Sequence, residues 1–256
     1  MIRKSDLTII LVWPVFATLI SYYLRVNFFI GTVLYFGLPA IYLSFKKKEF
    51  IHKALALAGT ALPILVVIDY IAVTTGTWFF PTSIFSYRIF GVVTFEVLFW
   101  YFSYAYFIVM FYEAFLDKHC KHVLTTRQLK NLFIFFVLIL AIFLWTVWTK
   151  GSFIKIPYWY MVIGIIFAII PISVTLFRFP KLLKKFFQAT IYFAYLSFLW
   201  ELVAVYHKQW TFPGNSFVGW VTIFGIRFPF EELFVWIILG AAGILSWYEF
   251  FDDDHK

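Results

Sequence analysis

Residues 131–149 read NLFIFFVLILAIFLWTVWT, an apolar run without a charged side chain. A helix needs about 20 mostly apolar residues to cross the hydrocarbon core of a bilayer. Comparable apolar stretches lie at about residues 7–24, 28–45, 54–73, 89–116, 157–177, 186–206 and 228–250. We therefore predict an all-α, polytopic membrane protein with about eight transmembrane helices.

The composition favours the same class of protein. The 256 residues are 63% hydrophobic, 25% aromatic and 13% charged, whereas a soluble domain is about a quarter charged. This composition excludes a soluble enzyme, a disordered tail and a nucleic-acid-binding module. The single cysteine, Cys120, also excludes an intramolecular disulfide framework.

The basic residues predict the orientation of the chain. If the N-terminus is cytoplasmic, the inner segments hold 15 of the 21 Lys and Arg residues and the outer segments hold 6. Cytoplasmic loops carry an excess of these residues. We therefore predict a multi-pass protein of the cell membrane with both termini in the cytoplasm. The net charge of +8 then needs no nucleic-acid partner to explain it.

Residues of the same type recur along the chain in the same order. Five pairs share one constant separation, which we call the repeat spacing, namely Pro39 and Pro171, Phe45 and Phe177, Asp69 and Glu201, Trp78 and Trp210, and Pro81 and Pro213. At a slightly longer spacing, Glu96, Trp100, Tyr112 and Glu113 recur as Glu232, Trp236, Tyr248 and Glu249. An insertion of four residues between Pro213 and Glu232 reconciles the two spacings.

This recurrence predicts two copies of a four-helix unit, at residues 1–117 and 131–252. Because four spans is an even number, both copies have the same orientation and are related by an axis along the membrane normal. The polar segment 118–130 is then a cytoplasmic linker, and residues 253–256 form a tail.

Acidic residues inside the predicted spans are the strongest candidates for function. An ionisable side chain within a span costs a few kcal/mol and is a functional hypothesis by default. The candidates are Asp69, Glu96, Glu201, Glu231 and Glu232. All five are expected toward the outer half of the bundle, at equivalent places in the two copies. A carboxyl buried in an apolar site can stay protonated at neutral pH and act as an acid.

A structural alternative applies to part of this set. Glu231 and Glu232 follow Pro229 and are expected near a helix start, where the helix dipole favours acids. Glu96 is expected one to two turns into its helix, so the alternative explains it poorly. Glu113 and Glu249 lie beside tyrosines near the inner interface. We expect those two acids to have a structural role.

Aromatic residues accompany the acids at fixed spacing. Trp78 and Trp210 each follow an intramembrane acid by nine residues. An aromatic face attracts a cation through its quadrupole. Carboxyl groups surrounded by aromatic faces are what carbocation chemistry on a polyene would need. The predicted substrate-binding residues are Trp78, Trp210, Trp100, Trp236, Phe95 and Phe230.

Motifs of several cofactor-dependent classes are absent. No GxGxxG follows a predicted strand, so no flavin or nicotinamide site of the Rossmann type is visible. No DDxxD-type diphosphate motif is present, because Asp252, Asp253 and Asp254 belong to the terminal tail. The segment His119-Cys120-Lys121-His122 is discounted as a metal site. No cofactor and no metal is predicted.

The second copy reads Glu201, Trp210, Gly225-Ile226-Arg227 and then Pro229-Phe230-Glu231-Glu232-Leu233-Phe234. The first reads Asp69, Trp78, Phe90-Gly91 and then Val93-Thr94-Phe95-Glu96-Val97-Leu98-Phe99. Over residues 28–252 this pattern resembles the membrane lycopene cyclase domain family of the heterodimeric or fused type. The chain departs from the family pattern in its first copy, where Val93 and Phe95 replace the Pro and the first Glu.

The resemblance implies a lycopene β-cyclase-like activity, an isomerase of carotenoid biosynthesis. The linear ψ end of lycopene would be protonated to a tertiary cation, attacked by a nearby alkene and deprotonated to a β-ring. Glu231 or Glu232 would donate the proton, with Glu96 as the facing partner. Asp69 and Glu201 would orient groups or relay protons, and the tryptophans would shield the cation. The chemistry requires no cofactor.

The expected partners are lycopene or a related polyene within the bilayer, lipids and, as an open alternative, a second copy of the chain. Three other functions remain open at this point. Water capture of the same cation would make the protein a carotenoid hydratase. The missing carboxyl at Phe95 favours a carotenoid-binding scaffold without activity. Parallel repeats with intramembrane acids are also found in transporters.

Overall fold

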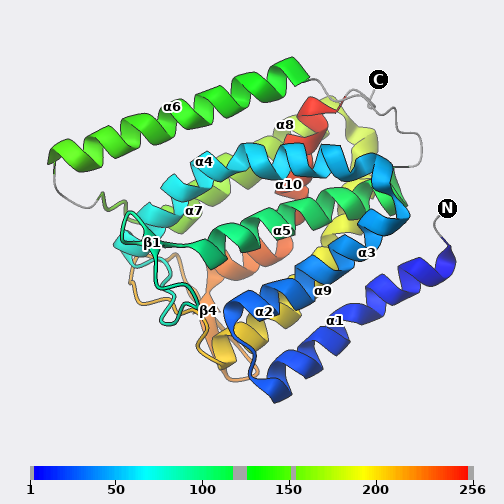
Figure 1. Ribbon diagram of the computed structural model, residues 1–256, viewed down its shortest axis with the longest axis horizontal. Coiled ribbons are helices and arrows are strands. Elements are labelled where there is room, and N and C mark those ends of the chain that lie inside the picture. The colour runs from blue at the N-terminus through cyan, green and yellow to red at the C-terminus, as the bar shows by residue number, and fades with distance from the viewer. Residues whose placement is uncertain (1–2, 118–125, 151–153, 253–256) are drawn as a thin grey trace.

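The computed structural model describes residues 3–117, 126–150 and 154–252. The tail 253–256 and the larger part of the predicted linker, with His119, Cys120 and His122, lie outside the described residues. The described chain is mostly helical, and most of its helices run side by side in one bundle (Figure 1).

The first half of the chain contains α1 (Lys4–Leu24), α2 (Phe28–Thr32), η1 (Val33–Gly37), α3 (Leu38–Lys46), η2 (Lys48–Phe50), α4 (Ile51–Thr75), α5 (Phe95–Phe111) and η3 (Tyr112–Leu116). The second half contains α6 (Thr126–Lys150), α7 (Trp159–Gly164), η4 (Ile165–Ile169), α8 (Ile170–Arg178), η5 (Pro180–Leu182), α9 (Leu183–Tyr206), η6 (Glu232–Ile238) and α10 (Gly240–Phe251).

Among the described residues, seven helical segments are long and apolar enough to cross a membrane. An eighth forms when η6 and α10 are taken together, although they meet at 46°. These segments follow the eight apolar stretches of the sequence in order. Such stretches become helices because a helix satisfies its backbone hydrogen bonds internally, which an apolar medium demands.

Two predicted helix starts, at residues 89 and 228, are wrong. Residues there belong to antiparallel hairpins, β1 (Arg88–Ile89) with β2 (Val93–Thr94) and β3 (Trp220–Ile223) with β4 (Ile226–Pro229). Phe224 and Gly225 form the turn between β3 and β4, with φ of 50° and 78°. Two consecutive positive φ values make the tight turn that a hairpin favours, and glycine adopts one without steric cost. The described chain is mostly helical, as predicted, and these two short hairpins are its departures from helix at the predicted span starts.

Short π-helical segments occur before Pro39 and Pro171, at η1 and η4. Proline has no N–H and its ring crowds the preceding turn of a helix. A π-type turn widens the helix at that place and is one recognised way to accommodate such a break. The two prolines stand at the same position in α3 and α8.

The bounds of successive elements repeat along the chain. The elements η1, α3 and η2 have the same types and lengths as η4, α8 and η5, which follow them at the repeat spacing. Phe79 and Thr211 are also separated by the repeat spacing, and they form a β-bridge with reciprocal backbone hydrogen bonds of 2.8 and 2.9 Å. Two segments at equivalent places in the sequence thus meet each other.

The helix α5 lies inside the bundle, against α3, α4 and α10 (Figure 1). By contrast α6 packs mainly on α4 and leaves most of its surface exposed. The start of α1 and the end of α10 lie at one end of the bundle, and β1 and β4 lie at the other (Figure 1). The acids Asp69, Glu96, Glu201, Glu231 and Glu232 are all close to this hairpin end.

Candidate functional site

Asp69 on α4 and Glu201 on α9 are each held by a tryptophan of the following loop. Trp78 Nε1 donates a hydrogen bond of 2.8 Å to Asp69 Oδ1. Trp210 Nε1 donates one of 3.2 Å to Glu201 Oε1. Both carboxyls are buried. The nine-residue spacing seen in the sequence therefore corresponds to two matching hydrogen bonds in the structure.

Glu232, at the start of η6, is buried and has a different partner. The hydroxyl of Tyr160 on α7 donates a hydrogen bond of 2.6 Å to Glu232 Oε2. The indole of Trp78 meets the Tyr160 ring edge-on, with centroids 5.3 Å apart. Asp69 and Glu232 are thus linked through Trp78 and Tyr160. Glu232 Oε1 and Asp69 Oδ2 are buried without a hydrogen-bond partner among the described residues.

Glu201 also belongs to this group, which we call the carboxyl cluster: Asp69, Glu201 and Glu232. Glu201 and Glu232 lie within electrostatic range of each other. Tyr101 on α5 lies close enough to Asp69 and Glu232 to be influenced by both charges. The helices α4, α5, α9 and η6 therefore bring three of the five predicted acids to one place.

Glu96 has a structural position that the sequence prediction missed. It is the second residue of α5, in the first turn, rather than one to two turns into the helix. Its Oε1 atom accepts hydrogen bonds from Ser83 Oγ at 2.6 Å, from the Ile84 amide at 2.6 Å and from the Phe85 amide at 3.3 Å. This carboxyl fastens the loop before the β1–β2 hairpin to the helix start.

Glu231 does the same in the second half of the chain. Its Oε1 accepts a hydrogen bond of 2.6 Å from the Val218 amide, and Val218 precedes Glu231 by the same interval as Ser83 precedes Glu96. By its contacts Glu96 therefore corresponds to Glu231. The longer of the two sequence spacings had paired Glu96 with Glu232 instead. The residue that corresponds to Glu232 in the first half is then Val97, which follows Glu96.

Aromatic side chains surround the carboxyl cluster. The ring centroids of Trp100 and Trp236 are 5.0 Å apart, and those of Trp100 and Trp210 are 5.6 Å apart. The predicted pair Phe95 and Phe230 lies outside this group. These two side chains are 49% and 37% exposed, and their ring partners are Phe85 and Phe234.

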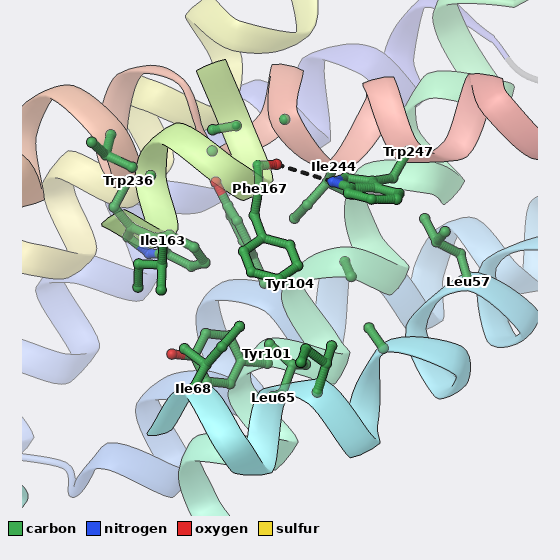
Figure 2. A pocket seen from close by; sticks show the side chains of 18 of the residues that line it. Leu57, Leu65, Ile68, Tyr101, Tyr104, Ile163, Phe167, Trp236, Ile244 and Trp247 are labelled. Atoms are coloured by element: carbon green, nitrogen blue, oxygen red, sulfur yellow. Dashed lines mark hydrogen bonds between the residues drawn. The ribbon is translucent and has the colours of Figure 1, made fainter. Parts of the chain in front are cut away.

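An apolar cavity of about 160 Å³ lies beside the cluster (Figure 2). We call it the groove. It lies among α4, α5, α7, η4 and α10, and residues of α6 border it. Ile68, Tyr160 and Trp236 line it near the carboxyl cluster, whereas Leu57 and Trp247 line it at the far end. The stretch of α4 from Leu57 to Ile68 corresponds to a length of about 16 Å along the helix axis.

Sequence reasoning did not single out Tyr160 or Tyr101. A tyrosine near the end of an apolar span looks like an ordinary interfacial residue. The sequence did contain one signal for Tyr160. The residue one repeat spacing before it is Phe28, so the hydroxyl is present only in the second half of the chain.

The other end of the bundle holds a second set of buried charges. Lys53 Nζ lies 2.9 Å from Glu113 and 3.0 Å from Asp252. Tyr112 donates a hydrogen bond to Glu249, and Tyr248 donates one to Glu113. Burial raises the pKa of Asp252 to about 6, and the Lys53 ammonium opposes that rise. These contacts join α4 and η3 to the end of α10.

Three carboxylates at this end, from Glu113, Asp117 and Asp252, lie within 4.8 Å of one another. Lys53 pairs with two of them, and Lys185 lies 2.7 Å from Asp117. Lysine side chains thus already supply positive charge to this group, as ion pairing of buried carboxylates requires.

No protein-family model, curated protein or solved structure matches this chain, so its function is inferred below from its residues and their geometry.

Proposed function

We propose that the protein is an integral membrane carotenoid end-group cyclase, which converts the linear ψ end of lycopene into a β-ring by acid–base chemistry. One observation carries the proposal: the buried carboxyl of Glu232 accepts a hydrogen bond from Tyr160, which lines an apolar groove together with Tyr101 and Trp236. An apolar polyene fits such a groove, and a buried carboxyl can supply a proton to its end.

In the proposed reaction Glu232 donates a proton to the terminal alkene, which leaves a tertiary cation. The neighbouring alkene attacks this cation and closes a six-membered ring. A ring proton then passes to a carboxylate, for which we propose Asp69. Before the next turnover Asp69 releases a proton to solvent and Glu232 takes one up from solvent. The product is an isomer of the substrate, so no oxidant or reductant takes part.

Glu96 and Glu231 are better assigned to loop attachment than to proton transfer. Their Oε1 atoms are engaged by loop donors at 2.6 Å. In all four acids the other carboxyl oxygen is buried without a hydrogen-bond partner among the described residues. The engaged oxygens differ in their donors: the donor to Glu232 is Tyr160, which lines the groove, and the donor to Asp69 is Trp78, which packs on Tyr160. We therefore narrow the choice of acid to Glu232 and replace Glu96 by Asp69 as its partner, with Glu201 as an orienting group.

The aromatic residues have a defined role in this proposal. Trp236 and Tyr101 line the groove, and Trp100 packs on both, with centroid distances of 5.0 and 4.8 Å. Aromatic faces stabilise a cation and exclude water from it. Exclusion of water favours ring closure over capture by water, and so favours the cyclase over the hydratase.

We also propose that the chain spans the cell membrane as two parallel four-helix units, with both termini in the cytoplasm. The repeated helix bounds and the Phe79–Thr211 bridge support a duplicated unit. The excess of Lys and Arg at the end of the bundle where α1 begins supports this orientation.

The test is expression in a host that accumulates lycopene, followed by liquid chromatography and mass spectrometry of the pigments. We expect a product of the mass of lycopene that absorbs at shorter wavelength. A product heavier by one water would make the protein a hydratase. Unchanged lycopene, with folded protein present, would overturn the proposal and favour a scaffold or a transporter.

A further inference from the structure

Both halves of the chain line the groove, and the groove has a counterpart formed by the residues one repeat spacing away, which is filled. Lining residues of the groove can be compared with the residues one repeat spacing away. Four of these pairs are Ile68 and Trp200, Ala61 and Phe193, Phe167 and Tyr35, and Ala168 and Phe36. In three of these four pairs the groove has the smaller side chain, and the fourth exchanges Phe for Tyr. In other pairs, such as Leu57 and Ala189 or Ile163 and Gly31, the groove has the larger side chain.

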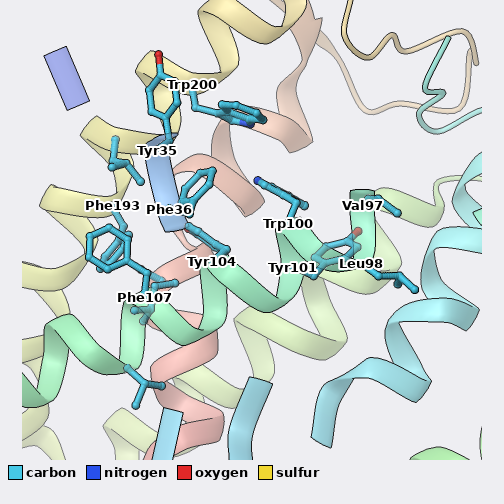
Figure 3. Packing of buried hydrophobic residues seen from close by; sticks show 14 of the residues in the cluster. Tyr35, Phe36, Val97, Leu98, Trp100, Tyr101, Tyr104, Phe107, Phe193 and Trp200 are labelled. Atoms are coloured by element: carbon cyan, nitrogen blue, oxygen red, sulfur yellow. The ribbon is translucent and has the colours of Figure 1, made fainter. Parts of the chain in front are cut away.

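Trp200 is the main residue that fills the second place. Its ring lies 5.2 Å from Tyr35 and 5.6 Å from Phe36, measured between centroids, in edge-to-face contacts. A Cβ atom added to Gly31 would lie 2.4 Å from the Trp200 ring, so the indole rests directly on that glycine. Figure 3 shows Trp200, Tyr35, Phe36 and Phe193 together in the buried cluster.

Phe193 completes the filling. Its ring centroid lies 5.2 Å from that of Phe107 and 6.0 Å from that of Tyr104. The residue in its place on the groove side is Ala61, which leaves space. Interiors are packed closely enough that such a change of volume decides whether a cleft exists.

Glu232 also has no acidic counterpart at the equivalent place. Beside the groove, Glu232 accepts a hydrogen bond from Tyr160. At the equivalent places in the other half, Val97 follows the loop-binding glutamate and Phe28 stands one repeat spacing before Tyr160. Two independent differences thus agree: the open groove has the acid and its hydroxyl partner beside it, and the filled counterpart has neither.

We infer that the protein takes one end of a linear polyene hydrocarbon at a time, through the groove alone, and that a two-ended substrate leaves and turns round before its second ring is formed. This inference rests on the proposed function. It assigns Ile68 and Ala61 as the residues that keep the groove open, and Trp200 and Phe193 as those that close its counterpart.

The first experiment fills the groove. In Ile68→Trp the groove receives the side chain that closes its counterpart, and Ala61→Phe does so at a second position. Trp200→Phe is the matched control in the filled counterpart. Binding is measured in detergent micelles by energy transfer from tryptophan to the methyl ester of trans-parinaric acid, a linear conjugated tetraene. Thermal unfolding of each variant verifies its fold.

We expect Ile68→Trp and Ala61→Phe to weaken binding of this probe by about tenfold or more, a loss of about 1.4 kcal/mol. We expect Trp200→Phe to change it by less than about threefold. If both groove variants fold and bind as the wild type does, the groove is not the polyene site. If Trp200→Phe remains folded but abolishes binding of the probe, the filled counterpart contributes to polyene binding and the inference is overturned.

The second experiment follows the products over time with lycopene in large excess over protein. The one-ended groove predicts that the monocyclic product accumulates first, and that a bicyclic product appears only after most lycopene is consumed. A bicyclic product present from the start would overturn the inference. Absence of any cyclic product, together with probe binding that Ile68→Trp weakens, would refute the cyclase and leave the groove assignment standing.

Discussion

The hydroxyl of Tyr160 donates a hydrogen bond of 2.6 Å to Glu232, a residue 72 positions further along the chain. Both side chains are buried. A hydrogen bond between two such groups fixes the direction in which the carboxyl points. It leaves Oε1 of Glu232 without a partner among the described residues, beside a groove that Tyr160 itself lines.

Glu232→Gln removes the proposed proton donor and keeps the size of the side chain. Because a positioned general acid contributes about 10²–10⁴-fold to a rate, we expect conversion of lycopene to fall by at least about 100-fold. Pigment analysis by chromatography measures the loss, and binding of the tetraene probe verifies that the groove is intact. Conversion at more than a third of the wild-type rate would remove Glu232 from the mechanism.

Tyr160→Phe removes only the hydroxyl that orients Glu232. We expect conversion to fall by about tenfold, since a hydrogen bond to such a group is worth about 1.5 kcal/mol. The matched control is Phe28→Tyr, which adds a hydroxyl at the equivalent place beside the filled counterpart. That change should leave the rate of conversion within about threefold of the wild type. Equal effects of the two substitutions would contradict the assigned asymmetry.

Glu96→Ala removes an acceptor for three loop donors, which are Ser83 Oγ and the amides of Ile84 and Phe85. Polar groups left without a partner cost about 1–3 kcal/mol of unfolding free energy. We expect thermal unfolding in detergent to shift downward accordingly. Glu96→Gln keeps one acceptor oxygen and should cost less. If Glu96→Gln instead abolished conversion at unchanged stability, Glu96 would be a catalytic residue.

Lys53→Met leaves Glu113 and Asp252 buried without the ammonium that lies within 3.0 Å of both. Breaking a buried ion pair from one side costs about 3–5 kcal/mol of unfolding free energy. The control is Lys47→Met, which breaks a more exposed pair with Glu49 and should cost at most about 1 kcal/mol. Equal losses from the two variants would show that the charges of Lys53, Glu113 and Asp252 do not stabilise the fold.

The positions of the helices could be predicted because a long apolar run commonly satisfies its backbone hydrogen bonds only as a helix. The two hairpins could not be predicted. The residues before Glu96 and Glu231 are aromatic and β-branched, and hydropathy alone does not separate a short strand from a helix start. The turn at Phe90 and Gly91, where both residues have positive φ, lay inside the predicted apolar stretch 89–116.

The candidate site was predicted in part for a similar reason. The pairing of Asp69 with Trp78 lies within nine residues, so the sequence displays it directly. The partners of Glu96 and Glu232 depend on where a loop folds and on how α7 packs against η6, and no local pattern encodes either. Whether Trp200 fills a cleft depends on the volumes of side chains that come from several helices. The sequence comparison therefore becomes informative only once the structure has shown where the groove lies.

In the proposed reaction a carboxyl protonates the end of a polyene and so starts ring closure. Conversion of lycopene in D₂O, followed by mass spectrometry of the product, measures this protonation. Protonation from a solvent-exchanged carboxyl predicts a product that carries one deuterium for each ring formed, and at least about 100-fold less of this product from the Glu232→Gln variant. A cyclic product without deuterium would contradict the account, because the ring would then have closed without a proton from the protein.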